Sequence, residues 1–231
     1  AGFSDVQDSA GASTTIATTR PDRIAGSDRY ATAADVLDSG YLAGTWTVGT
    51  TKNVVIANGE TAKDGADALA ANYLAAAKGA PILLTSADSL PNATRDALIK
   101  LFKGYNASDI TVYVMGKDDS VSAAVRNQIS FIINATAALT SSQSVKVVEV
   151  AGDNRFQTSA AAATEAGTGA LQLHSLTTSG AWLRTAFLAS GTTNADALAV
   201  GPVAVNAGIP VLLTSGTALD QKVQDAIKAL G

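Results

Sequence analysis

The sequence predicts an α/β fold in which mainly parallel sheets are covered by helices, with one strand–helix module present twice. Short aliphatic segments alternate along the chain with longer segments whose apolar residues recur at helical spacing. This alternation is typical of a parallel sheet covered on both faces. Hydrophobic residues make up 47% of the chain, but aromatic residues only 5%. Small side chains therefore supply much of the packing, which favours helices that lie close to the sheets.

The second observation is an internal repeat. Three motifs of the first half return in the second half in the same order: 23–33 as 149–159, 67–70 as 196–199 and 79–86 as 208–215. Matching residues are offset by 126 positions in the first motif (155 − 29) and by 129 in the second (196 − 67). Because order and spacing are both kept, we infer that one module was duplicated.

The two copies differ in length. We place an N-terminal extension or donor segment at 1–20, a first repeat at 21–144 and a second, C-terminally truncated repeat at 145–231. The second repeat has no counterpart of 110–133, which has the pattern of a strand followed by a helix. A parallel sheet that lacks this strand is expected to have an open edge.

The individual elements follow from the same patterns. Short β-branched or aliphatic runs predict strands at 53–57, 81–85, 110–115, 145–150, 185–189 and 210–214. The segments between them predict helices near 28–37, 65–78, 91–102, 120–133, 154–165, 194–206 and 218–230. Pro91 stands at a first helical position, and Gly79 and Gly208 stand where helices stop. Strand and helix therefore alternate through both repeats.

Composition argues against several classes of function. The net charge of −4 disfavours general nucleic-acid binding, which needs clustered positive charge. No apolar run approaches the ~20 residues that span a bilayer. The first residue, Ala1, fits a mature exported chain whose signal peptide has been removed. With no Cys and a single His, His174, the sequence offers no pattern for a catalytic triad or a zinc site. We expect a non-catalytic protein without metal or cofactor.

One run of motifs indicates a family. Residues 23–33 are Arg-Ile-Ala-Gly-Ser-Asp-Arg-Tyr-Ala-Thr-Ala, and Val-Val-Ile-Ala-Asn-Gly-Glu, Asp-Ala-Leu-Ala-Ala and Ala-Pro-Ile-Leu-Leu-Thr follow. With these motifs the chain resembles the cell wall binding repeat 2 family, well over 23–134 and more loosely over 148–230. The resemblance implies exported modules, usually in sets of three, that anchor surface and S-layer proteins to anionic secondary wall polymers. It also implies a Toprim-like three-layer α/β sandwich.

The candidate polymer-binding residues are Arg23, Arg29 and Arg155. Arg29 and Arg155 stand at the starts of predicted helices, where an Arg beside the helix N-terminus can hold a phosphate or carboxylate. Arg23 enlarges the basic patch in the first repeat only. The alternative is that Arg29 and Arg155 each pair internally with a carboxylate such as Asp67 or Asp196 and fix a loop. Internal pairing is the more common role of such residues.

A second candidate is the Ile-Leu-Leu signature, which the resemblance associates with anchoring. Its members are Ile82, Leu83 and Leu84 in the first repeat and Val211, Leu212 and Leu213 in the second. Continuous apolar residues of this kind are typical of a parallel strand buried on both faces. The physical interpretation is therefore structural, and a mutation here would act through folding.

Two main functions remain as alternatives. The first is a secreted, cell-surface module that anchors its protein to an anionic cell-wall polymer, either teichoic-like or a secondary wall polysaccharide. The second is a self-assembling structural subunit of a surface layer or filament, whose partners are other copies of itself. In that case the strand-like segment 14–18 of one copy would fill the open sheet edge of the next. A hydrolase is a weaker third candidate, because the sequence carries no catalytic motif.

Overall fold

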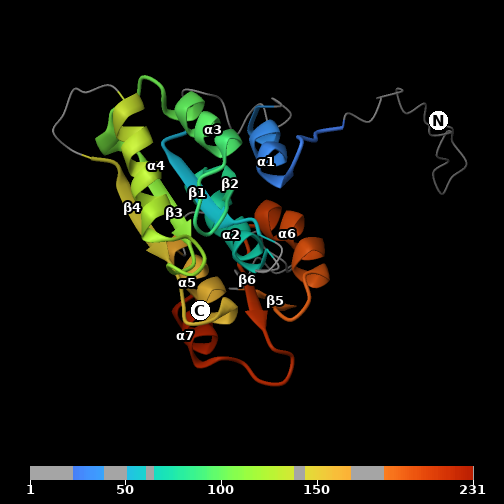
Figure 1. Ribbon diagram of the computed structural model, residues 1–231. Coiled ribbons are helices and arrows are strands. Elements are labelled where there is room, and N and C mark those ends of the chain that lie inside the picture. Colours follow the sequence, from blue (N-terminus) through green and yellow to red (C-terminus); the bar gives the residue numbers. More distant parts are fainter. Residues whose placement is uncertain (1–22, 39–50, 61–64, 138–143, 168–184, 231) are drawn as a thin grey trace, which may run out of the picture.

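The computed structural model describes residues 23–38, 51–60, 65–137, 144–167 and 185–230 (Figure 1). In chain order they form α1 (Arg29–Asp38), β1 (Asn53–Asn58), α2 (Ala66–Lys78), β2 (Ile82–Thr85), α3 (Asn92–Phe102), the 3-10 turn η2 (Ala107–Asp109), β3 (Thr111–Met115), α4 (Ala123–Thr136), β4 (Lys146–Val150), α5 (Arg155–Ala166), β5 (Phe187–Ser190), α6 (Ala195–Ala207), β6 (Val211–Thr214) and α7 (Gln221–Leu230). All the strands and helices that the sequence predicts are present. None of the helices in these ranges combines the length and apolarity that crossing a membrane requires.

The strands form two parallel sheets. The larger sheet has the order β2-β1-β3-β4, and the smaller consists of β5 and β6. Figure 1 shows α3 and α4 together on one side of the larger sheet, with α2 and α5 behind the other. The predicted α/β class, with parallel sheets covered by helices, is confirmed.

The larger sheet is the middle of three layers. Val54 and Ile56 of β1 face one way and pack with α3 and α4. Val55 and Ala57 face the other way and pack with α2 and α5. All four side chains are fully buried. Because successive strand residues point to opposite faces, a strand covered on both sides must be apolar throughout, as β1 is.

The smaller sheet is also covered on both faces. Val211 and Leu213 of β6 pack toward α6 and the start of α2, whereas Leu212 packs toward α5 and α7. These three residues form the second copy of the Ile-Leu-Leu signature. In the first copy, Leu83 of β2 is fully buried. Both copies therefore lie in core strands, which agrees with the structural interpretation of the signature.

Strand β4 connects the two repeats. In the sequence it opens the second repeat, but it pairs with β3 of the first, in a register that runs from Thr111 opposite Lys146 to Met115 opposite Val150. The sequence repeat divides at 144/145, whereas the two sheets divide after β4. The second repeat thus completes the sheet of the first, which ties the two repeats together through main-chain hydrogen bonds.

A partly buried arginine holds β4 in place. Arg126 of α4 forms an ion pair with Glu149 of β4. The same guanidinium donates hydrogen bonds to the carbonyl oxygens of Val121 (2.8 Å) and Gly116 (3.1 Å). Glu149 stands where the first repeat has Arg23, and this ion pair gives the difference a structural reason.

Strand β5 has a neighbour on one side only within the described residues. Its equivalent β1 pairs with both β2 and β3, whereas β5 pairs with β6. Leu188 of β5 is 54% exposed, although its counterpart Ile56 in β1 is fully buried. This is the open edge that the missing counterpart of 110–133 predicts. The proposed donor segment 14–18 lies outside the described residues.

Candidate functional site

Each repeat begins its first helix with the same capped turn. The Oδ1 atom of Asp28 accepts a hydrogen bond from the N–H of Ala31 (2.8 Å). In the second repeat, Oδ1 of Asn154 accepts one from the N–H of Gln157 (2.9 Å). A side-chain oxygen in this position satisfies an N–H group that the first helical turn leaves without a partner. The two turns are therefore equivalent in geometry as well as in sequence.

A glycine two residues before each cap lets the chain turn tightly. The N–H of Gly26 donates to Oγ1 of Thr32 (3.1 Å), and the N–H of Gly152 donates to Oγ1 of Thr158 (3.2 Å). A Cβ added at Gly152 would lie 2.2 Å from the Cβ of Gln157. Glycine is required here because the chain approaches its own helix too closely for any side chain.

The two arginines that follow make the same hydrogen bond. Arg29 is the first residue of α1, and its Nη1 donates to the carbonyl oxygen of Gly59 (2.5 Å). Arg155 is the first residue of α5, and its Nη1 donates to the carbonyl oxygen of Gly191 (2.9 Å). Gly59 follows β1 and Gly191 follows β5, so each Arg ties the start of a helix to the loop after the next strand. The predicted equivalence of Arg29 and Arg155 is confirmed.

These hydrogen bonds refine the sequence-based alternatives for the arginines. Both side chains fix a loop through a hydrogen bond to a main-chain carbonyl oxygen, that of Gly59 or Gly191. Asp67 lies in the first turn of α2, and Asp196 in the first turn of α6. Arg29 takes part in no ion pair with a described residue and, like Arg23, is exposed.

A cleft of about 490 Å³ opens between the repeats. Its walls are the carboxyl ends of β3 and β4 and the first turns of α2 and α5. Its charged residues are Asp67, Lys117, Asp119, Asp153 and Arg155. Ligands of open parallel sheets bind beyond the carboxyl ends of the strands, so the cleft lies where this class of fold places a binding site.

Gly116 shapes one wall of this cleft. It follows β3 with a φ of 84°, a left-handed conformation that favours glycine. A Cβ added there would lie 2.7 Å from Oδ2 of Asp67 and 2.5 Å from the Cβ of Ser120. The start of α2 can therefore approach the end of β3 only because this residue has no side chain.

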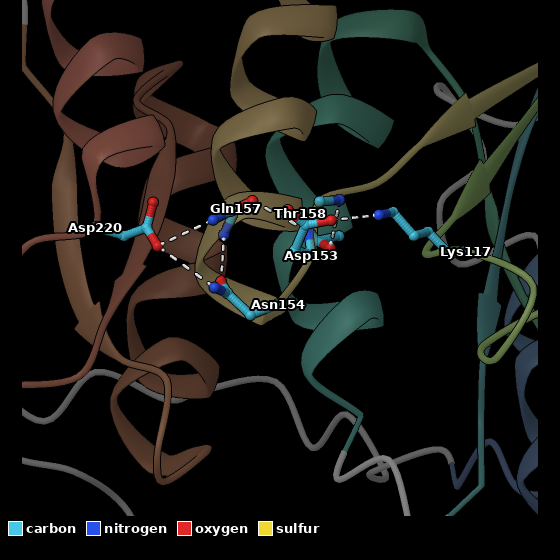
Figure 2. A network of polar contacts seen from close by, with 7 residues as sticks. Lys117, Asp153, Asn154, Gln157, Thr158 and Asp220 are labelled. Atoms are coloured by element: carbon cyan, nitrogen blue, oxygen red, sulfur yellow. Dashed lines mark hydrogen bonds and ion pairs between the residues drawn. The ribbon is translucent and has the colours of Figure 1, made fainter.

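A polar network extends from the cleft residues Lys117 and Asp153 to Asp220 of the second repeat (Figure 2). Lys117, just after β3, forms an ion pair with Asp153, just after β4. The N–H of Asp153 donates to Oε1 of Gln157 (3.1 Å). The side-chain amides of Gln157 and Asn154 both donate to Oδ2 of Asp220, at 3.2 and 3.4 Å. Lys117 belongs to the first repeat and Asp220 to the second, so the network links the loops of the two repeats.

The network lowers the pKa values of its two carboxyl groups. The hydrogen bond and the charge of Lys117 lower the pKa of Asp153. For Asp220, the hydrogen bond from the N–H of Lys222 lowers the pKa most, followed by that from Gln157. The Lys117–Asp153 pair is also exposed, at 50% and 76% of the two side chains. Such a pair is weak, so the Lys117 ammonium can exchange its carboxylate for another anion.

The structure brings together only part of the predicted site. Of the three predicted polymer-binding residues, Arg155 lines the cleft, in company with Asp67. Arg23 and Arg29 are not among the cleft residues. Sequence reasoning missed Lys117, whose only signal is that it follows a predicted strand by two residues. Within the described ranges, no group of three or more His, Asp or Glu side chains could hold a metal ion.

Comparison with known proteins now adds to this geometry. The sequence model of the family described as Cell wall binding domain 2 matches residues 23–126 and 149–231. N-acetylmuramoyl-L-alanine amidase LytC of Bacillus subtilis (strain 168) is 30% identical over 218 residues, which cover 94% of this chain and 36% of the amidase. The match to the family therefore includes both helix-start motifs, all of β3 and the last two residues of β4.

Solved structures give the same result. Cwp8 from Clostridium difficile has a TM-score of 0.66 and 26% identity, over 88% of this chain and 29% of that one. Cwp6 from the same organism has a TM-score of 0.67 and 25% identity, over 99% of this chain and 31% of that one. This chain spans about a third of the length of each of these three relatives. Because the family model covers both repeats, the chain belongs to the cell wall binding domain 2 family.

Proposed function

We propose that the chain anchors its protein at the cell surface by binding an anionic cell-wall polymer in the cleft between the repeats. Membership of a cell wall binding family supports a location at the wall and a role in binding rather than catalysis. The observation that carries the choice of ligand is that Lys117 and Arg155 line one cleft at the carboxyl ends of β3 and β4.

The chemistry of the cleft suits a charged sugar polymer. Teichoic-like polymers and acidic polysaccharides present phosphate or carboxylate groups on a backbone rich in hydroxyls. The ammonium group of Lys117 is a compact positive charge, and the planar guanidinium of Arg155 can donate two parallel hydrogen bonds to one anionic group. Both are favourable partners for phosphate and carboxylate. The first turns of α2 and α5 add partial positive charge. Asp67 and Asp119 can accept hydrogen bonds from sugar hydroxyls.

A second, larger cavity is less suited to this ligand. It has a volume of about 550 Å³ and lies between α5 and α7 beside β4. Its charged residues are Glu149, Glu165, Lys222 and Asp225. This cavity sets three carboxylates against one ammonium, whereas the cleft sets three carboxylates against two cations, Lys117 and Arg155. A polyanion is therefore repelled less in the smaller cleft, which favours the cleft as the polymer site.

Arg23 and Arg29 are proposed as outer contacts of the same polymer. Arg29 also has a structural hydrogen bond to Gly59, so its substitution would disturb both roles. Arg23 is exposed, and its charge can be reversed with less structural effect. We expect Arg23→Glu to reduce wall association while its circular dichroism spectrum stays native. Unchanged association of the folded variant would remove Arg23 from the site.

Co-sedimentation with purified cell walls tests the proposed function. The chain should pellet with native walls, and not with walls whose anionic polymer has been removed by acid extraction. Bound protein should decrease as salt rises, because exposed charge pairs are screened over about 8–10 Å at physiological ionic strength. Equal binding to native and acid-extracted walls would contradict a role for the polymer.

One observation favours assembly as a second candidate function. The outer edge of β5 is unpaired within the described residues, with Leu188 exposed beside it. An extended segment could add to this edge through main-chain hydrogen bonds, and we propose segment 14–18 of a neighbouring copy as the donor. Deletion of residues 1–20 should then abolish the resulting particles in light scattering and electron microscopy. A deletion variant that assembles as the full chain does would rule out strand donation.

A further inference from the structure

A carboxylate outside the cleft fixes the turn that carries Asp153. Asp220 directly precedes α7 and is not among the residues that line the cleft. Its Oδ1 accepts a hydrogen bond from the N–H of Lys222 (2.8 Å) in the first turn of α7. Its Oδ2 accepts from the side-chain amides of Gln157 (3.2 Å) and Asn154 (3.4 Å) at the start of α5. The two oxygens of Asp220 therefore join the starts of two helices.

Helix α7 gives this carboxylate a fixed base. Val223, three residues after Asp220, is fully buried, and Ala226 is 4% exposed. Both belong to one apolar cluster with Ala160 and Ala163 of α5. Close-packed helices of this kind keep their relative positions. Asp220 thus holds the start of α5 from a point that the core itself keeps in place.

The contacts continue from Asp220 to Lys117 (Figure 2). The amide of Gln157 donates to Asp220, and its Oε1 accepts a hydrogen bond from the N–H of Asp153 (3.1 Å). The carboxylate of Asp153 then forms the ion pair with Lys117. An exposed ion pair loses much of its energy in ordering its side chains, so a partner whose main chain is already fixed binds better. We call Asp220, Gln157 and Asp153 the clamp.

The equivalent positions of the first repeat cannot form this clamp. Gln157 matches Ala31 (157 − 31 = 126), and Asp220 matches Pro91 (220 − 91 = 129). Neither counterpart has a polar side chain, yet the capped turn of the first repeat has the same geometry. The turn therefore forms without a clamp. The clamp is present only in the second repeat, where the turn lies beside Lys117 in the cleft.

We propose that Asp220 is a positioning residue of the cleft. Acting through Gln157, it holds Asp153 against Lys117, which weakens the binding of polymer anions to Lys117. This inference rests on the proposed function, because the polymer anion and Asp153 compete for the same ammonium group. An anion must displace a carboxylate that is held in position instead of one on a mobile turn. The second repeat thereby sets the affinity of a cation that the first repeat supplies.

Gln157→Ala tests the clamp without any change of charge. The variant should fold, because Ala31 occupies the equivalent position in the first repeat. In the native chain, the hydrogen bond and the charge of Lys117 lower the pKa of Asp153 from 3.8. NMR titration of the Asp153 carboxyl should give a higher pKa in Gln157→Ala, because the ion pair is less well ordered. An unchanged pKa would overturn the proposal.

Binding to purified wall polymer, measured by calorimetry at low salt, is the second readout. Gln157→Ala should bind about twofold to threefold more tightly, because an exposed ion pair is worth at most about fivefold in affinity and the variant only loosens it. Gln221→Ala is the matched control, since its amide donates to Asp225 (2.9 Å) outside the cleft. In an Asp153→Asn background, Gln157→Ala should have no further effect. A gain of the same size in that background would overturn the proposal.

Two variants of Asp220 separate its hydrogen bonds from its charge. Asp220→Asn and Asp220→Ala remove the same negative charge, but only the asparagine keeps an oxygen that accepts from Gln157. Asp220→Ala should therefore have the higher Asp153 pKa and the tighter polymer binding of the two. Equal values in the two variants would overturn the role of the hydrogen bond.

The two readouts also distinguish this inference from the proposed function. A raised Asp153 pKa in Gln157→Ala, with unchanged affinity for the polymer, would support the clamp and contradict Lys117 as the polymer site. An unchanged Asp153 pKa would overturn the clamp, whereas binding to native but not to acid-extracted walls would still support the proposed function.

Discussion

Arg29 and Arg155, which are 126 positions apart (155 − 29), donate the same hydrogen bond to equivalent glycine carbonyls, at 2.5 and 2.9 Å. Each is the first residue of a helix, and each closes the loop that follows the next strand. One role of the duplicated motif, 23–33 and 149–159, is therefore to fix the loop that follows β1 in the first repeat and β5 in the second. Arg155 differs from Arg29 in that it also lines the cleft between the repeats.

We first predict that Arg29→Ala and Arg155→Ala destabilise the fold to a similar extent. Each removes a charge-assisted hydrogen bond to a carbonyl group, which is worth about 1–2 kcal/mol. Urea denaturation should show both midpoints lowered by a similar amount. Arg95→Ala is the control, because Arg95 is 45% exposed and pairs with its sequence neighbour Asp96. If Arg29→Ala and Arg155→Ala lowered the urea midpoint no more than Arg95→Ala does, the loop-fixing role would be contradicted.

The attachment of β4 depends on Arg126. Its side chain is 15% exposed, and its loss would leave Glu149 and two carbonyl groups without this partner. Arg126→Ala should therefore cost about 2–3 kcal/mol of unfolding free energy. Hydrogen exchange of the β4 amides should increase more than that of the β1 amides. Equal exchange in the two strands would show that Arg126 does not hold β4.

Stability should fall in acid partly because of the network at the cleft. The folded-state pKa values of Asp153 and Asp220 are lowered from 3.8. A lowered carboxyl pKa gives stability that is fully present above the unfolded value and is lost as pH falls through the folded value. The denaturation midpoint should thus be flat near neutral pH and fall below about 3.8. In Asp220→Asn the fall should be smaller, and an identical pH profile would exclude this contribution.

Asp153 should act against polymer binding. Its carboxylate forms an ion pair with Lys117, the residue proposed to bind the polymer. Because both side chains are exposed, an anionic group of the polymer can replace this carboxylate. Asp153→Asn should therefore tighten binding to purified wall polymer, measured by calorimetry at low salt. Asp96→Asn, an exposed change of the same charge on α3, should have no such effect. Weaker binding by Asp153→Asn would mean that the ion pair organises the cleft instead of competing with the ligand.

Much of this fold could be predicted from the sequence because its signals are local. Aliphatic runs, Pro91 and the glycines at helix ends identify the elements, and the repeat identifies equivalent residues. Two helices start a few residues later than the sequence predicts, because a side chain caps the turn before each of them. Helix α4 starts at Ala123 because the Oγ of Ser122 accepts from the N–H of Val125, and α7 starts at Gln221 because Asp220 accepts from the N–H of Lys222.

The contacts between the repeats could not be predicted in this way. The pairing of β4 with β3 joins parallel strands, and such long-range pairings leave no local trace in a single sequence. The ion pair between Lys117 and Asp153 depends on that pairing, so the cleft was missed with it. Arg155 could be predicted as a site residue because it matches Arg29 in the repeated motif.

The central claim is that the polymer binds in the cleft beside Lys117, and one pair of variants tests it most directly. Lys117→Glu and Lys146→Glu make the same charge change at opposite ends of neighbouring strands, since Lys117 follows the carboxyl end of β3 and the exposed Lys146 begins β4. Binding of each to purified wall polymer is measured by co-sedimentation at one fixed salt concentration. We predict about tenfold weaker binding for Lys117→Glu, a loss of ~1.4 kcal/mol, with Lys146→Glu close to the wild type. Equal binding by the two variants would contradict the proposed site.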